Sequence, residues 1–222
     1  MLAKEPIGSG SFQILDKQNR ILEALLGTCV GVAIVDETAG IGGVYHILLA
    51  EPTSAGSAWG AEMYASTGMP LFIEELIAKG ARPKSMRATI AGGALVGPVS
   101  REDFELDIGG RTSDVVTRIL EKHDIPIVQS ETGGYFSCCL SLNMRNFSVS
   151  IEPIGDVRSS YSPTTKKLEM SEIDSAIGEV CPIPQLALKI MRMISAEDYA
   201  MKDIANEVRQ DQVLSAKVLT IG

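Results

Sequence analysis

Two apolar runs joined by a glycine-rich turn constrain the fold of this chain more than any other stretch. The runs Val30–Asp36 and Val44–Leu49 are rich in β-branched residues, and each is short enough to form a single buried strand. Between them, residues 37–43 are polar at first and then contain three glycines, which is typical of a turn. The pattern therefore predicts a β-hairpin whose far end returns beside its start.

Reactive side chains stand at the two places that this hairpin would bring together. Cys29 directly precedes the first run, and His46 lies in the second run. An imidazole beside a thiol can accept the thiol proton and can later donate a proton to a leaving amine. From the residues alone, the alternative is that Cys29 is a small core residue and His46 is structural.

The turn around Cys29 offers a further group that such chemistry needs. A sharp turn that contains glycine leaves backbone N–H groups available to hold an oxyanion. We therefore take the amides of Gly27 and Val30, on either side of the cysteine, as candidates for oxyanion binding.

Short motifs follow one another in order between residues 6 and 153. They are Leu26-Gly27-Thr28-Cys29-Val30, Ile41-Gly42-Gly43, His46-Ile47-Leu48-Leu49, Ile90-Ala91-Gly92-Gly93-Ala94 and Glu131-Thr132-Gly133-Gly134. As an ordered set they resemble the CheD family, the chemoreceptor glutamine deamidases of bacterial chemotaxis. The resemblance implies a protein-glutamine glutaminase that converts receptor glutamines to glutamate and releases ammonia.

The resemblance also assigns roles to residues. It implies that Cys29 is the nucleophile of a thioester mechanism and that His46 transfers protons, with neither a cofactor nor a metal. Thr28 replaces a serine of the family, and Glu23 stands where the family commonly has an assisting threonine. Both are possible assisting residues. Glu23 is either a third member that orients the imidazole or an exposed strand residue.

Partners follow from the same resemblance. They would be methyl-accepting chemotaxis receptors, and a CheC-like phosphatase is a possible second partner. The alternative function is a signalling adaptor without catalysis that binds receptors or such a phosphatase.

The remaining patterns of residues 1–154 indicate an α+β domain, a layered sandwich of the α/β/β type. Helical spacing of apolar residues predicts a helix within residues 61–79, and a second helix is expected after residue 110, capped by Thr112 or Ser113. Strands are predicted at residues 85–90, 105–108 and 125–129, followed by a hairpin of residues 136–142 and 147–152.

The end of the chain differs in composition. Residues 155–170 are polar and contain few apolar residues, so we expect a linker, and residues 171–222 are predicted to be helical at 171–177, 184–194, 201–209 and 212–220. Residues 177–221 resemble the opening of an HDOD domain, a helical signalling module. The matching residues are Pro182, Pro184, Gln185, Ala187, Leu188, Ile190, Ile204, Ala205, Val208, Asp211, Leu214, Lys217, Val218 and Leu219. Because the resemblance stops within that domain, we expect the chain to be a fragment of a longer protein.

Charge and composition exclude several other classes. A net charge of −8 without a basic cluster argues against nucleic-acid binding. No apolar run approaches the roughly 20 residues of a membrane span, and the N-terminus does not resemble a signal peptide. The four cysteines form neither a disulfide framework nor a C-x-x-C motif, so we expect a cytoplasmic protein.

Overall fold

A computed structural model describes residues 2–52, 60–96, 106–154 and 201–209. The chain divides into two units, residues 1–155 and 156–222, and each is described by itself. The described part of the first unit contains two β-sheets and two α-helices, whereas the described part of the second is a single helix.

The first unit is built from a four-stranded and a five-stranded sheet. Sheet A has the order β1-β3-β8-β9, with bounds Ala3–Pro6, Arg20–Leu26, Cys138–Asn143 and Val149–Pro153. Sheet B has the order β2-β5-β4-β6-β7, with bounds Ser11–Asp16, Ile41–Ile47, Val30–Asp36, Arg87–Gly92 and Ile127–Thr132. Strands β4 and β5 form the hairpin that the sequence predicts, and they are the two most fully buried strands of sheet B.

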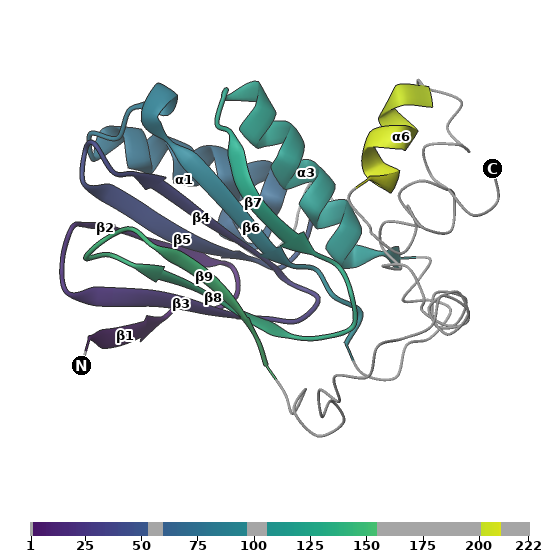
Figure 1. The fold of residues 1–222 in the computed structure, drawn as a ribbon, viewed down its shortest axis with the longest axis horizontal. Coiled ribbons are helices and arrows are strands. Elements are labelled where there is room, and N and C mark those ends of the chain that lie inside the picture. Colours follow the sequence, from purple (N-terminus) through teal and green to yellow (C-terminus); the bar gives the residue numbers. More distant parts are fainter. Residues whose placement is uncertain (1, 53–59, 97–105, 155–200, 210–222) are drawn as a thin grey trace, which may run out of the picture. The chain divides into compact units, whose positions relative to one another are not determined.

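Two helices complete the layers. Helices α1 (Ala65–Ala78) and α3 (Ile108–Lys122) cover one face of sheet B, and sheet A packs on the other face (Figure 1). Successive residues of β4 alternate between the two resulting cores. Val32 and Ile34 face the helices, and Ala33 and Val35 face sheet A. The predicted α+β sandwich with layers α/β/β is therefore confirmed.

The first predicted helix is present, with some differences in detail. A 3₁₀ turn, Ala61–Met63, precedes α1, and Pro70 lies inside the helix rather than at its start. The apolar stripe of α1 is buried as expected, with one exception. Ile77 is 42% exposed, because it falls on the edge of the stripe that turns away from the sheet.

Two local predictions are wrong. Gly42 and Gly43 belong to β5 and not to the turn, and close neighbours occupy the place of a side chain at both. A Cβ on Gly43 would lie 2.7 Å from the carbonyl oxygen of Gln13 in β2, and one on Gly42 would lie 3.2 Å from the side chain of Leu142 in β8. The strand expected at residues 105–108 is not formed in the described part of that range, residues 106–108. Ile108 begins α3, and its N-cap is Asp107, whose carboxylate accepts a hydrogen bond from the amide of Gly110 (3.2 Å).

The two helical residues expected to cap α3 lie inside it instead. The hydroxyls of Thr112 and Ser113 donate to carbonyl oxygens one turn earlier. The predicted C-terminal hairpin of this unit is confirmed as β8 and β9, and the strand expected before it is β7.

In the second unit the structure describes helix α6, Met201–Val208, which confirms one of the predicted tail helices. The other three helices and the linker lie outside the described residues. The domain boundaries at residues 154 and 170 therefore stay predictions. Within the described residues, no helix is long and apolar enough to cross a membrane.

Candidate active site

Cys29 and His46 lie at one end of the sandwich, where the chain passes between the sheets. Residues 7–10 join β1 of sheet A to β2 of sheet B, and residues 27–29 join β3 to β4. Residues 133–137 return from β7 to β8. We call these three segments the crossing loops. Ser9 of the first loop reaches His46, and Gly27 of the second lies close to Ser137 of the third.

The thiol of Cys29 is half-buried at this end and packs against the core between the sheets. Its backbone is fixed by the glycine loop that follows β6. The carbonyl oxygen of Cys29 accepts a hydrogen bond from the amide of Gly93 (2.8 Å), and that of Gly27 accepts one from Ala94 (2.8 Å). Gly92 packs so closely that a Cβ there would lie 2.4 Å from the Cys29 oxygen. The cysteine turn is therefore held rigidly by backbone contacts.

His46 lies deeper, with 5% of its surface exposed. Its Nδ1 is 3.0 Å from the carbonyl oxygen of Ile7. A carbonyl can only accept a hydrogen bond, so Nδ1 must carry the proton, and in the neutral ring Nε2 is the acceptor. The backbone carbonyl of His46 also accepts from the amide of Gly10 (2.7 Å), so that the first crossing loop is tied to the histidine twice.

Ser9, in that same loop, is a site residue that the sequence reasoning missed. Its Oγ lies 3.2 Å from Nε2 of His46. A hydrogen bond between its side chain and the sulfur of Cys29 also lowers the pKa of that thiol. Among the hydrogen bonds of the described residues, Ser9 is the group that links the thiol to the imidazole. The sequence feature that could have pointed to Ser9 is its hydroxyl, placed between two glycines, Gly8 and Gly10.

The electrostatics of the site favour neutral groups at rest. Burial raises the pKa of the Cys29 thiol, and the bond from Ser9 opposes this only in part. Burial also lowers the pKa of His46, against the smaller opposing effect of its bond to Ile7. At neutral pH the site therefore holds a protonated thiol and a neutral imidazole. This imidazole is suited to act as a general base.

The structure does not bring Glu23 to this site. Glu23 lies in β3 between the inward-facing residues Leu22 and Ala24, so its side chain points away from the space between the sheets. Its carboxylate contacts Lys4 Nζ (2.8 Å) and Ser141 Oγ (3.2 Å) instead. The acceptor that orients the imidazole is the Ile7 carbonyl, and we do not carry Glu23 into the mechanism.

The other candidates divide between the turn and the sheet. Thr28 is exposed beside the thiol, and Gly27 is partly exposed. In the described part of the chain, no hydrogen bond outside the strands is donated by the amides of residues 27–29. Val30 is fully buried as the first residue of β4, which is bonded to a strand on each side, so its amide belongs to the sheet.

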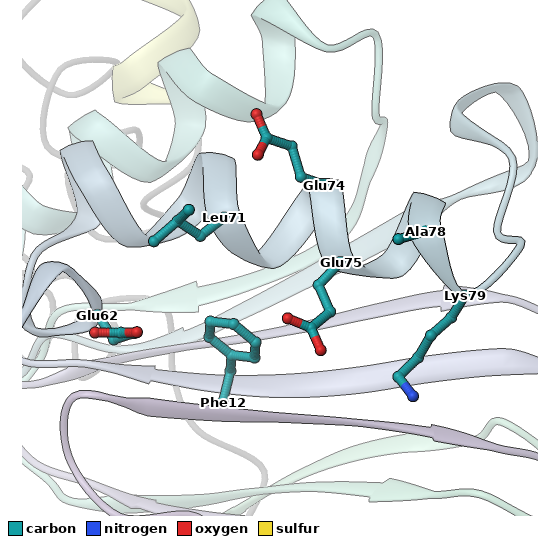
Figure 2. A pocket seen from close by; sticks show the side chains of 7 residues that line it. All are labelled: Phe12, Glu62, Leu71, Glu74, Glu75, Ala78 and Lys79. Carbon is teal, nitrogen blue, oxygen red and sulfur yellow. The ribbon is translucent and has the colours of Figure 1, made fainter.

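A separate groove lies away from these residues, between the edge strand β2 and helix α1. It is lined by Phe12, Glu62, Leu71, Glu74, Glu75, Ala78 and Lys79. Figure 2 shows Phe12 below the helix, with Glu75 and Lys79 descending toward the strand. The groove contains neither a thiol nor an imidazole. Within the described residues, no group of three or more histidine, cysteine or acidic side chains is placed to hold a metal.

This arrangement defines a class: an α+β sandwich with a half-buried thiol and a buried, oriented imidazole at one end. Comparison with known proteins gives the family. Residues 48–153 match the family model described as "CheD chemotactic sensory transduction". A protein of Clostridium kluyveri is 32% identical over 149 residues, which cover 67% of this chain and 92% of the relative. A protein of Desulforamulus reducens is 33% identical over 153 residues, covering 69% and 92%. The chain belongs to the CheD family.

Both relatives carry the name "Probable chemoreceptor glutamine deamidase CheD". The family-model match begins after His46, so it includes neither of the two candidate catalytic residues. Residues 180–222 match the HDOD domain model, in agreement with the resemblance of the tail.

Solved structures give weaker likenesses. A Bacillus licheniformis hypothetical protein, YfiH, has a TM-score of 0.36 and 18% identity, covering 54% of this chain and 49% of that one. A Neisseria meningitidis protein, NMB0706, has a TM-score of 0.37 and 11% identity, covering 69% and 76%. At this level, neither structure bears on function.

Proposed function

We propose that this chain deamidates glutamine side chains of methyl-accepting chemotaxis receptors, producing glutamate and ammonia. The observation that supports the proposal is the half-buried thiol of Cys29, which Ser9 links to a buried imidazole, His46, whose tautomer is fixed with Nε2 as acceptor. The names of the CheD relatives supply the substrate class. The reaction is that of an amidohydrolase.

In the proposed mechanism, the thiol of Cys29 gives up its proton toward Nε2 of His46 as sulfur attacks the carboxamide carbon. The amides of the turn at residues 27–29 stabilise the oxyanion, with Gly27 as one candidate donor. The imidazolium then protonates the departing ammonia, which leaves a thioester. Water, deprotonated by the same imidazole, hydrolyses the thioester to glutamate and regenerates the thiol. Thr28 borders the path by which the substrate reaches the sulfur.

Partners belong to the same proposal. The receptor is the substrate, and a CheC-like phosphatase is a second candidate partner on the basis of the family resemblance. We also propose that the HDOD-like segment serves signalling and takes no part in the chemistry, because both candidate catalytic residues lie in the first unit.

The test is ammonia release from a purified receptor cytoplasmic fragment, with deamidation located by mass spectrometry. We expect the full chain to release ammonia and Cys29→Ala to release none above the fragment alone. Cys139→Ala is the matched control, because that thiol is also half-buried but contacts Ser141 in β8 instead of the site. Equal release from Cys29→Ala and the unsubstituted chain would remove the proposed mechanism. Binding of the fragment without release would leave an adaptor.

A further inference from the structure

The first crossing loop inserts a hydroxyl between the two groups that must exchange a proton. Ile7 at its start donates its amide to the carbonyl of Glu23 in sheet A (2.7 Å). Gly10 at its end donates to the carbonyl of His46 in sheet B (2.7 Å). The loop is thus anchored to both sheets, and Ser9 is held over the site between these anchors.

Gly10 itself reinforces this placement. Its φ is +69°, a conformation that favours glycine, and a Cβ there would overlap the sulfur of Met63. The loop therefore has little freedom to carry Ser9 away from the histidine. The hydroxyl reaches Nε2 at 3.2 Å and also contacts the thiol of Cys29.

The direction of each hydrogen bond follows from the fixed tautomer. Nδ1 of His46 donates to the Ile7 carbonyl, so Nε2 must accept, and the Ser9 hydroxyl must be its donor. With its proton directed at Nε2, the Ser9 oxygen has lone pairs free to accept the proton of the Cys29 thiol. The 3.2 Å contact of Ser9 with Nε2, together with its hydrogen bond to the sulfur, forms a chain that runs from sulfur through oxygen to nitrogen.

We propose that Ser9 relays the proton from Cys29 to His46 in the deamidation reaction. This inference rests on the proposed function. In the relay, the S–H bond of Cys29 breaks as that proton bonds to the Ser9 oxygen. The original Ser9 proton bonds at the same time to Nε2. The products are a thiolate, an intact hydroxyl and an imidazolium, so one proton has moved from sulfur to nitrogen without any redox change. The hydroxyl then donates to the thiolate and stabilises it.

The experiment compares Ser9→Ala, Ser9→Thr and Ser11→Ala in the full chain. Ser11 is the matched control, because its hydroxyl bonds the carbonyl of Gly8 in the same segment (2.6 Å) and its strand position is next to the loop. The first readout is the pH dependence of Cys29 alkylation by iodoacetamide, followed by peptide mass spectrometry. The second is ammonia release from the receptor fragment, in water and in mixtures with heavy water.

We expect Ser9→Ala to move the alkylation midpoint of Cys29 to higher pH and to slow ammonia release by about 100-fold or more. Ser9→Thr, which keeps a hydroxyl, restores both, and Ser11→Ala changes neither. Two protons in motion give a curved dependence of rate on heavy-water fraction in the unsubstituted chain. A residual rate in Ser9→Ala has a linear dependence.

An unchanged alkylation midpoint in Ser9→Ala, or a rate within twofold of the unsubstituted chain, would overturn the relay. So would a linear heavy-water dependence in the unsubstituted chain. The proposed function fails separately, by absence of ammonia release from the unsubstituted chain. In that case the alkylation midpoint still decides whether Ser9 stabilises the Cys29 thiolate.

Discussion

Gly92 offers a direct test of how the backbone positions the nucleophile. Its φ is +92°, and a Cβ at this position would lie 2.4 Å from the carbonyl oxygen of Cys29. Ordinary van der Waals contact begins near 3.4 Å, so Gly92→Ala must displace the cysteine turn or β6 by roughly 1 Å. The positive φ costs about 1–2 kcal/mol and the overlap about 1–3 kcal/mol. We therefore expect a stability loss of about 2–5 kcal/mol.

The effect on activity separates position from stability. Misplacement of a reacting group by about 1 Å costs on the order of 100-fold in rate. We therefore expect ammonia release by folded Gly92→Ala to fall about 100-fold. Gly40→Ala is the matched control, because Gly40 also has a positive φ (+72°), and its Cβ would meet only Lys17, at 3.9 Å. That variant should lose about 1–2 kcal/mol and keep full activity.

Urea unfolding followed by far-ultraviolet circular dichroism gives the stabilities, and ammonia release is measured where each variant is folded. The reasoning is refuted if Gly92→Ala loses no more stability than Gly40→Ala and keeps the rate of the unsubstituted chain. Equal rate losses in both variants would show that the rate follows stability and not the position of Cys29.

Three further predictions concern titration and buried polar groups. Burial lowers the pKa of His46 from 6.5 and raises that of Cys29 from 9.0. The rate of ammonia release should therefore stay level from pH 6.5 to pH 9.0 and fall only outside that range; a fall on the acid side centred above pH 6.5 would contradict this. Tyr45→Phe should cost about 1–2 kcal/mol in urea unfolding, because its buried hydroxyl donates its single proton to the backbone carbonyl of Glu62 (2.6 Å), whereas the exposed Tyr135→Phe should cost almost nothing; equal costs would oppose this. Burial would raise the pKa of the Asp36 carboxyl, but hydrogen bonds from backbone N–H groups outweigh it and hold the pKa below 3.8. Stability should therefore be lost as the pH falls through that lowered pKa, and Asp36→Asn should show a weaker loss over the same range in thermal unfolding; identical pH dependence in both would refute the assignment.

The sequence was sufficient for the parts of the site that are local. The β4–β5 hairpin follows from two β-branched runs and a turn, and it places Cys29 and His46 at one end without any long-range information. The burial side of β3 could not be read in this way, because Ile21 and Leu25, on the face of Glu23, are as apolar as the residues on the buried face. The expectation that Glu23 assists came from the family pattern.

The parts that the sequence could not supply depend on contacts between distant segments. Ser9 lies 37 residues from His46 in the chain, and nothing in its own segment indicates which strand it faces. Gly43 has the composition of a turn, yet it lies within a strand because the edge strand and Phe72 approach it closely. A glycine indicates that there is no room for a side chain, but not which neighbour occupies that room. Such a position can be assigned to a strand or a turn only once the neighbouring layer is known.

The crossing loops tie catalysis to completion of the whole sandwich. Both sheets contribute to the site. Sheet A leads through β3 to Cys29, sheet B carries His46 in β5, and Ser9 lies in the loop that joins the two sheets. A molecule that is partly folded, or that is cleaved in a crossing loop, would therefore lack the proposed activity even with most of its strands paired. Under the proposed function, recovery of deamidation after dilution from denaturant should track the slowest long-range association, and newly made copies would become active only when the last crossing loop is in place.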